Sequence, residues 1–215
     1  MTAAAAADSS AAPTAGQNAA MASDDSVTVL AALRLEALAI GGAVVRTGMG
    51  HVKAGATGAR LADTLAPGSP LAIVGIAGGL DPTLGPGQLV VADSLHAPDG
   101  ADPIPLPHAP AVADALRSHG RDVRVGGVAC ATAIVHGDGR AALARGGALA
   151  VEMESVWLAR VLAGHPLVVV RAVGDTARDG FVRGNVKALA ALRRLRPALD
   201  QWARELAGRN RPTDA

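Results

Sequence analysis

The sequence predicts an α/β protein with three layers, in which helices cover both faces of a central, mostly parallel mixed sheet. Two observations carry this prediction. Short runs such as 71–76 and 167–170 are almost entirely aliphatic, which is typical of strands that are buried on both faces. Stretches of helical composition follow these runs along the chain, and parallel strands need such crossover connections.

The expected elements alternate along the chain. Strands are expected at 27–33, 44–47, 71–76, 89–93, 123–133, 149–151 and 166–173. Helices are expected at 53–65, 111–119, 139–145, 154–163 and 185–206, with an interruption at Pro197 in the last of them. No internal repeat divides this pattern.

The length of 215 residues suits one domain, which we expect over residues 26–207. Residues 1–25 contain no branched aliphatic side chain, so they cannot bury enough apolar surface to offset their ordering entropy. We therefore expect a disordered tail there, and a second one at 208–215. The segment 96–110 contains five prolines, which favours an excursion loop with a lid or binding role.

Composition narrows the class of protein. A net charge of +1 argues against a nucleic-acid or membrane-surface partner, and no long apolar run predicts a membrane span. The single cysteine, Cys130, excludes an intrachain disulfide and a multi-cysteine zinc site, and it fits a cytoplasmic location. The six histidines are scattered without the spacing of metal ligands, so we expect neither a metal nor another cofactor.

Polar residues follow several of the expected strands. In open α/β sheets, ligands bind beyond the carboxyl ends of the strands. The residues expected there are five carboxylates and two glycine-containing turns: Glu36, Asp93, Glu152, Glu154 and Asp175, with Gly48-Met49-Gly50 and Gly78-Gly79. Each carboxylate alone also fits a structural role as a helix cap or a first-turn helix residue. Their shared position predicts a ligand site.

Three segments resemble motifs of the nucleoside phosphorylase/nucleosidase superfamily. Residues 74–93 are similar to its central motif, Ala150-Val151-Glu152-Met153-Glu154-Ser155 to its ribose-binding segment, and residues 170–177 to its catalytic-aspartate segment. The segments occur in the family's order, and the resemblance spans roughly 27–206. Methylthioadenosine/S-adenosylhomocysteine nucleosidases share all three. The hopanoid-associated phosphorylase branch is similarly short between Glu36 and Gly48.

The resemblance implies a phosphorylase-like fold and cleavage of the N-glycosidic bond of a purine nucleoside, with an adenosine derivative that carries a bulky or apolar 5′ group as the expected substrate. Asp175 would protonate N7 of the leaving base. Glu154 would bind the ribose hydroxyls and stabilise the cationic sugar, and Met153 would pack on the sugar. Glu36 would lie beside the nucleophile, which is either phosphate as a co-substrate or water.

Further positions follow from the same resemblance. Backbone N–H groups of Gly78, Gly79 and the loop Gly48-Met49-Gly50 would hold the anion. Glu152 either contacts the substrate or braces the loop. Ile134 stands near the place where the family carries a base-stacking phenylalanine. By resemblance alone, a homodimer or a larger homo-oligomer is expected.

Two departures from the family pattern leave an alternative open. Ile76 and Gly174 stand where nucleosidases commonly have serine, so a hydroxyl near the nucleophile and a support for Asp175 are both missing. The alternative is a non-catalytic nucleoside-binding protein on the same fold. A Rossmann-like oxidoreductase is a weaker interpretation, because Gly48-Met49-Gly50 is not followed by the third glycine of the dinucleotide-binding motif.

Overall fold

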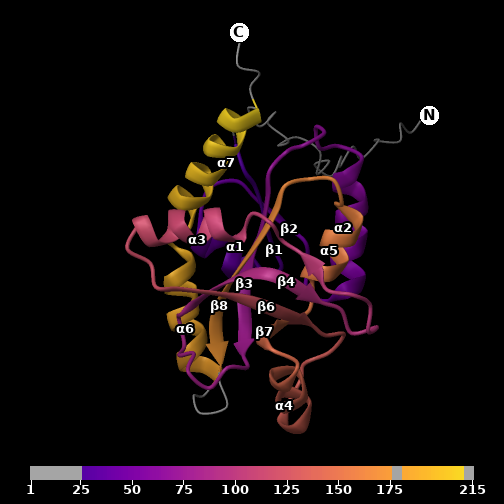
Figure 1. The fold of residues 1–215 in the computed structure, drawn as a ribbon, viewed down its shortest axis with the longest axis vertical. Coiled ribbons are helices and arrows are strands. Elements are labelled where there is room, and N and C mark those ends of the chain that lie inside the picture. The colour runs from indigo at the N-terminus through magenta and orange to yellow at the C-terminus, as the bar shows by residue number, and fades with distance from the viewer. Residues whose placement is uncertain (1–25, 176–180, 211–215) are drawn as a thin grey trace, which may run out of the picture.

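Helices cover both faces of a single mixed sheet in the computed structural model, which describes residues 26–175 and 181–210 (Figure 1). The strands are β1 (Thr28–Ala31), β2 (Val44–Arg46), β3 (Leu71–Gly79), β4 (Leu89–His96), β5 (Ile104–Pro105), β6 (Val123–Cys130), β7 (Ala148–Glu152) and β8 (Leu167–Asp175). The helices are α1 (Arg34–Ile40), α2 (His51–Ala62), α3 (Ala109–Ser118), α4 (Gly137–Arg145), α5 (Ser155–Val161), α6 (Phe181–Leu192) and α7 (Arg196–Asn210).

The middle of the sheet closes on itself. Strand β3 pairs with β8, β8 with β4, β4 with β6, β6 with β7, and β7 pairs back with β3. Strands β1 and β2 extend the sheet from β3, and β5 lies at the edge of β4. The pairings are parallel except β3–β7, β4–β5 and β4–β8, so the mostly parallel mixed sheet is confirmed.

Two apolar cores lie on opposite faces of the sheet, as the layers in Figure 1 show. One core joins the sheet to α1, α3, α6 and α7, and it includes the fully buried Trp202. The other joins the sheet to α2 and α5, around Val156 and Leu158. Aliphatic strand residues alternate between the two cores, Val168 and Val170 on one and Val169 on the other, so the aliphatic runs of the sequence fill both.

Several boundaries differ from the expected ones. Strand β3 continues to Gly79, so the glycine pair at 78–79 lies within the strand rather than in a turn. Helix α1 was not expected as a separate helix, and the proline-rich segment contains the short strand β5. The expected interruption near Pro197 is confirmed, but α6 begins at Phe181, earlier than expected. Pro197 lies in the first turn of α7, where its missing N–H has no helical partner to lose.

The proposed tails fall largely outside the described residues. The tail at 1–25 lies outside them, as do residues 211–215 of the second tail, whereas residues 208–210 continue α7. The proline-rich loop is fixed to the domain by the buried Leu106 and by an ion pair of 2.8 Å between Arg160 and Asp99. Within residues 26–175 and 181–210, no helix is long and apolar enough to cross a membrane.

Candidate active site

A cluster of buried charges lies beside the middle of β3 and β8, close to the point where β7 ends. Glu36, Glu152 and Glu154 and the guanidinium of Arg171 are each at most 5 % exposed, although charged side chains are rarely buried without partners. The residues come from segments far apart in the sequence, and the sheet brings them together. Three of the expected site residues, Glu36, Glu152 and Glu154, are thus brought together around Arg171.

Within this cluster, Glu152 and Arg171 pair with each other and with Ser155. Glu152 accepts hydrogen bonds from the backbone N–H groups of Glu154 (3.0 Å) and Ser155 (3.0 and 3.1 Å) and from the Ser155 hydroxyl (3.1 Å). Arg171 donates from Nη2 to Glu152 and, at 2.8 Å, to the Ser155 hydroxyl. Both oxygens of Glu152 are thus used within the protein, which favours the bracing role for Glu152 over substrate contact.

Arg171 was not selected from the sequence. Burial works against its charge, but the neighbouring carboxylates of Glu152, Glu154 and Glu36 outweigh burial and raise the pKa of Arg171. Its Nε is buried and has no hydrogen-bond partner among the described residues. The signal was present, since Arg171 interrupts an otherwise apolar strand at a position buried on both faces. A charge at such a place requires partners of opposite charge.

Glu154 is less fully engaged than Glu152. Its Oε1 accepts a hydrogen bond of 2.8 Å from the N–H of Gly50, a residue 104 positions away, and its Oε2 lies 3.9 Å from Arg171 Nη2. Burial, followed by the negative charges of Glu152 and Glu36, raises the pKa of Glu154 to about 7, although Arg171 and the Gly50 N–H act in the opposite direction. Glu154 therefore exchanges its proton near neutral pH, a property often found at functional sites.

Glu36 closes the first turn of α1 and ties it to β3. One carboxylate oxygen accepts the N–H of Leu33 (2.8 Å), and the other accepts the N–H of Ile76 (2.8 Å). A Cβ added at Gly75 would lie 2.8 Å from the Glu36 carboxylate and 2.4 Å from Arg171 Nη1, so Gly75 separates these two groups. Each carboxylate oxygen has a second acceptor position, so Glu36 retains capacity for a further donor.

Asp175 ends β8 and is held by Arg140 of α4. Arg140 Nη1 lies 2.6 Å from Asp175 Oδ2, and Nη2 donates to the carbonyls of Gly79 (2.6 Å) and Asp175 (3.3 Å). A Cβ at Gly78 would lie 3.0 Å from Arg140 Nη2, so the glycine leaves room for the guanidinium. Arg140 thus holds Asp175 in place, although the absence of a serine at 174 had suggested that Asp175 lacks such a contact. No local sequence pattern on α4 predicts this role of Arg140.

The two departures from the family pattern are packed against each other. A Cβ added at Gly174 would lie 2.5 Å from the Cγ2 of Ile76 and would collide with the side-chain oxygen of Asn185. A serine at 174 therefore does not fit beside an isoleucine at 76. Gly184 of α6 also approaches the Gly174 carbonyl too closely for any side chain at 184. Ile76 and Gly174 are one packing arrangement that fixes the end of β8.

The remaining candidates lie at different distances from the cluster. Met153 packs beside Gly50, 4.0 Å from where a Gly50 Cβ would be. The N–H of Gly50 is already bonded to Glu154, so in this arrangement it does not serve an anion. Met49 and Ile134 are exposed, at 55 % and 68 %. Asp93 is exposed on β4, where Leu89 lies opposite Ala172 and Val91 opposite Val170 of β8, so Asp93 lies toward the start of β8 and away from Asp175.

Fold and site together define an α/β protein with buried carboxylates at the strand ends. A family model described as the phosphorylase superfamily matches residues 42–198, and the chain therefore belongs to this superfamily. A comparison with curated protein sequences found no significant match.

Solved structures share the fold at low sequence identity. The 5′-methylthioadenosine/S-adenosylhomocysteine nucleosidase of Campylobacter jejuni has a TM-score of 0.71 at 15 % identity, over 83 % of this chain and 98 % of that one. The nucleosidase of the same name from Neisseria meningitidis, in complex with methylthio-immucillin-A, has a TM-score of 0.68 at 19 % identity, with the same coverage. A futalosine hydrolase mutant of Helicobacter pylori has a TM-score of 0.65 at 19 % identity, also over 83 % and 98 %.

Proposed function

We propose that this protein is an enzyme that cleaves the N-glycosidic bond of a purine nucleoside. The observation that carries the proposal is the buried carboxylate of Glu154, whose pKa is raised to about 7, three residues after Val151. Val151 and Asp175 both lie opposite Gly78 of β3, on its two sides. Membership of the phosphorylase superfamily supports the proposal. We propose an adenosine derivative with a bulky or apolar 5′ group as substrate, in keeping with the substrates named for the nucleosidases of the same fold.

The chemistry follows from the charges that develop as the bond breaks. The sugar becomes cationic and the leaving purine becomes anionic. Glu154 in its ionised form would stabilise the sugar cation, and Met153 would pack against the sugar. Asp175, which is paired with Arg140, would first take up a proton from solvent and then give it to N7 of the base, which makes the base a better leaving group. Preorganised charges of this kind contribute to the rate because they do not have to reorient during the reaction.

We infer that water, rather than phosphate, is the nucleophile. Three buried carboxylates face one buried guanidinium in the cluster, so the charge there is negative whenever Glu154 is ionised. A phosphate dianion beside Glu36 and Glu154 would be repelled, whereas Glu36 could accept a proton from a bound water. The N–H of Gly50, a candidate donor to an anion, is already bonded to Glu154.

The nucleophile is tested by the sugar product. The purified protein is incubated with several 5′-substituted adenosines, with and without phosphate, and the pentose product is identified by mass spectrometry. We expect equal rates of adenine release in the two buffers and a free pentose as the product. Release that requires phosphate, together with a pentose 1-phosphate product, would contradict hydrolysis and establish phosphorolysis.

Arg140 is proposed as a positioning residue for Asp175. It holds Oδ2 of the carboxylate at 2.6 Å, which leaves Oδ1 to face the base. Its positive charge would also oppose the negative charge that builds up on the leaving purine. We expect Arg140→Ala to lower kcat by roughly 10- to 100-fold, because misplacement of a catalytic group by about 1 Å costs rates of this order.

The matched control is Arg145→Ala, which removes the same charge from an exposed position on the same helix. Arg140→Lys should restore part of kcat, because lysine keeps the charge but not the two-pronged contact. Melting temperatures check that each variant is folded, because Arg140 also ties α4 to Gly79 and Asp175. Equal kcat values for Arg140→Ala and Arg145→Ala would show that Arg140 does not position Asp175 for catalysis.

A homodimer or a larger homo-oligomer also remains a proposal. It is supported by the exposed apolar side chains Met49 and Val52, which flank Gly50 at the start of α2.

A further inference from the structure

A groove on the α6 side of the sheet gathers positive charge away from the candidate active site. It encloses about 480 Å³, which lies in the range of small-molecule sites. Four of its lining residues are cationic: Arg121, Lys187, Arg193 and Arg194; the others are Pro86, Gly87, Ala190 and Ala191. None of these is among the site residues described above, so the groove requires a separate account.

The cations of the groove are free of acidic partners within residues 26–175 and 181–210. Every ion pair found there involves other arginines, although the net charge of the whole chain is only +1. Asp122, which follows Arg121, accepts a hydrogen bond of 2.9 Å from the Gln88 side chain. A concentration of unpaired positive charge in a hollow attracts anions and raises their local concentration.

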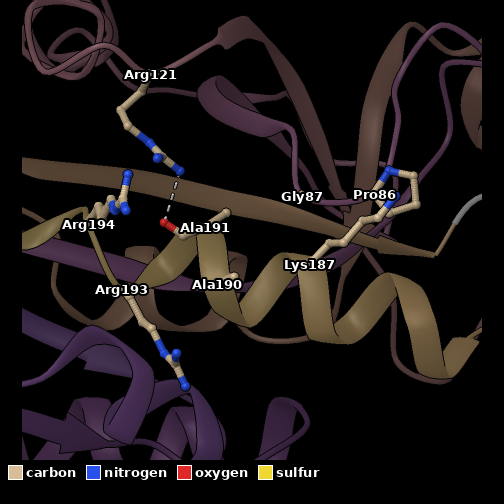
Figure 2. A pocket seen from close by; sticks show the side chains of 8 residues that line it. All are labelled: Pro86, Gly87, Arg121, Lys187, Ala190, Ala191, Arg193 and Arg194. Carbon is tan, nitrogen blue, oxygen red and sulfur yellow. Dashed lines mark hydrogen bonds between the residues drawn. The ribbon is translucent and has the colours of Figure 1, made fainter.

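Arg121 is prearranged to receive such an anion. Its Nη2 donates to the carbonyl of Ala191 at 3.2 Å, which fixes the guanidinium against the last turn of α6 (Figure 2). Its Nε is buried and has no hydrogen-bond partner among the described residues. Its Nη1 makes no hydrogen bond within the described residues and is not buried, so it can donate to an anionic oxygen.

The spacing of the cations selects for more than one phosphate. Figure 2 shows Arg121 and Arg194 at one end of the groove and Lys187 beside Pro86 at the other, with Ala191 between them. Lys187 lies on α6, whereas Arg194 lies in the turn that follows the end of α6 at Leu192. One phosphate group does not reach both ends, whereas a chain of linked phosphates does.

The uncharged residues that line the groove do not indicate what a ligand contains besides its anionic groups. They consist of alanine, glycine and proline, with no aromatic ring on which a base could stack. We propose that this groove is a binding site for a small oligophosphate anion, recognised through its phosphate groups by Arg121, Arg194 and Lys187. Guanidinium groups suit this task because their N–H donors match phosphate oxygens in pairs.

The test measures binding of inorganic triphosphate and inorganic monophosphate by isothermal titration calorimetry at constant ionic strength. We expect triphosphate to bind at least 10-fold more tightly than monophosphate, and Arg194→Ala and Lys187→Ala each to weaken triphosphate binding by about 10-fold. The matched control is Arg193→Ala. Its guanidinium points away from Arg121 in Figure 2, so we expect a change of less than 3-fold. Melting temperatures check that every variant is folded.

Three outcomes would overturn the proposal. The first is no measurable binding of triphosphate by the wild-type protein. The second is an equal loss of affinity in Arg193→Ala and Arg194→Ala, which would indicate diffuse charge instead of a site. The third is displacement of triphosphate by a short DNA duplex at equal phosphate concentration with a loss in the same variants, which would assign the groove to nucleic acid.

Discussion

Replacing Asp175 with asparagine is expected to slow release of the base by a factor of about 10² to 10⁴, the usual contribution of a general acid. Asparagine keeps the size of the side chain and an oxygen that Arg140 can hold, so the contact now seen at 2.6 Å is largely retained. What is lost is the proton that the carboxyl group would give to N7. The measurement is kcat/KM for adenine release from a 5′-substituted adenosine.

Asp93→Asn is the control for this variant. Asp93 also lies on a strand of the sheet, but it is exposed, and the register of β4 places it toward the start of β8, away from Asp175. We expect Asp93→Asn to retain the wild-type rate. If Asp175→Asn and Asp93→Asn release adenine equally fast, Asp175 is not the acid, and the proton must come from another group.

Glu154→Gln is expected to reduce activity and to increase stability at the same time. Activity should fall by roughly 10²–10³, because glutamine lacks the charge that stabilises the cationic sugar. In the folded protein the pKa of Glu154 rises from 4.5 to about 7, so folding keeps the proton that the unfolded chain releases between these pH values. The wild-type protein therefore loses about 3 kcal/mol of stability between pH 4 and pH 8, at about 1.4 kcal/mol for each pKa unit.

Glutamine cannot ionise, so the variant escapes this loss. Denaturant unfolding of both proteins at pH 4 and pH 8 should show that the advantage of Glu154→Gln is greater at pH 8 by about 3 kcal/mol. If the two proteins differ in unfolding free energy by the same amount at pH 4 and pH 8, burial does not destabilise the ionised form of Glu154. In the wild-type enzyme, kcat/KM should fall as the pH drops below about 7, where Glu154 becomes protonated, and Glu154→Gln should lack this dependence.

The core strands could be predicted because each contains consecutive aliphatic residues, a local pattern that indicates burial. All of β8 but its last residue is buried, and the run 167–170 is aliphatic at every position. Closure of the sheet was not predictable in this way, since the antiparallel pairings of β3 with β7 and of β4 with β8 leave no mark on either partner's composition. Asp93 shows the consequence, because it follows apolar strand residues as expected but the pairing of β4 with β8 places it toward the opposite end of β8 from Asp175.

The carboxylates of the site could be selected from the sequence, but only some of the residues that contact them could be. Arg171 stands within an apolar strand, so its burial and its need for carboxylates follow from local pattern. Arg140 lies on a helix without buried residues, and its contact with Asp175 spans 35 positions. The assignment of Glu152 to a bracing role likewise needed the hydrogen bonds that its two oxygens accept.

The central claim is that this chain breaks the N-glycosidic bond of a purine nucleoside. The most direct measurement is chromatographic detection of free adenine when the purified wild-type protein and the Asp175→Asn variant, prepared identically, are incubated with a 5′-substituted adenosine. We predict adenine in proportion to the amount of wild-type protein and a rate at least 100-fold lower with the variant, in line with the loss of a general acid. Saturable binding of the nucleoside without release of adenine by the wild-type protein would contradict the claim and would identify a nucleoside-binding protein.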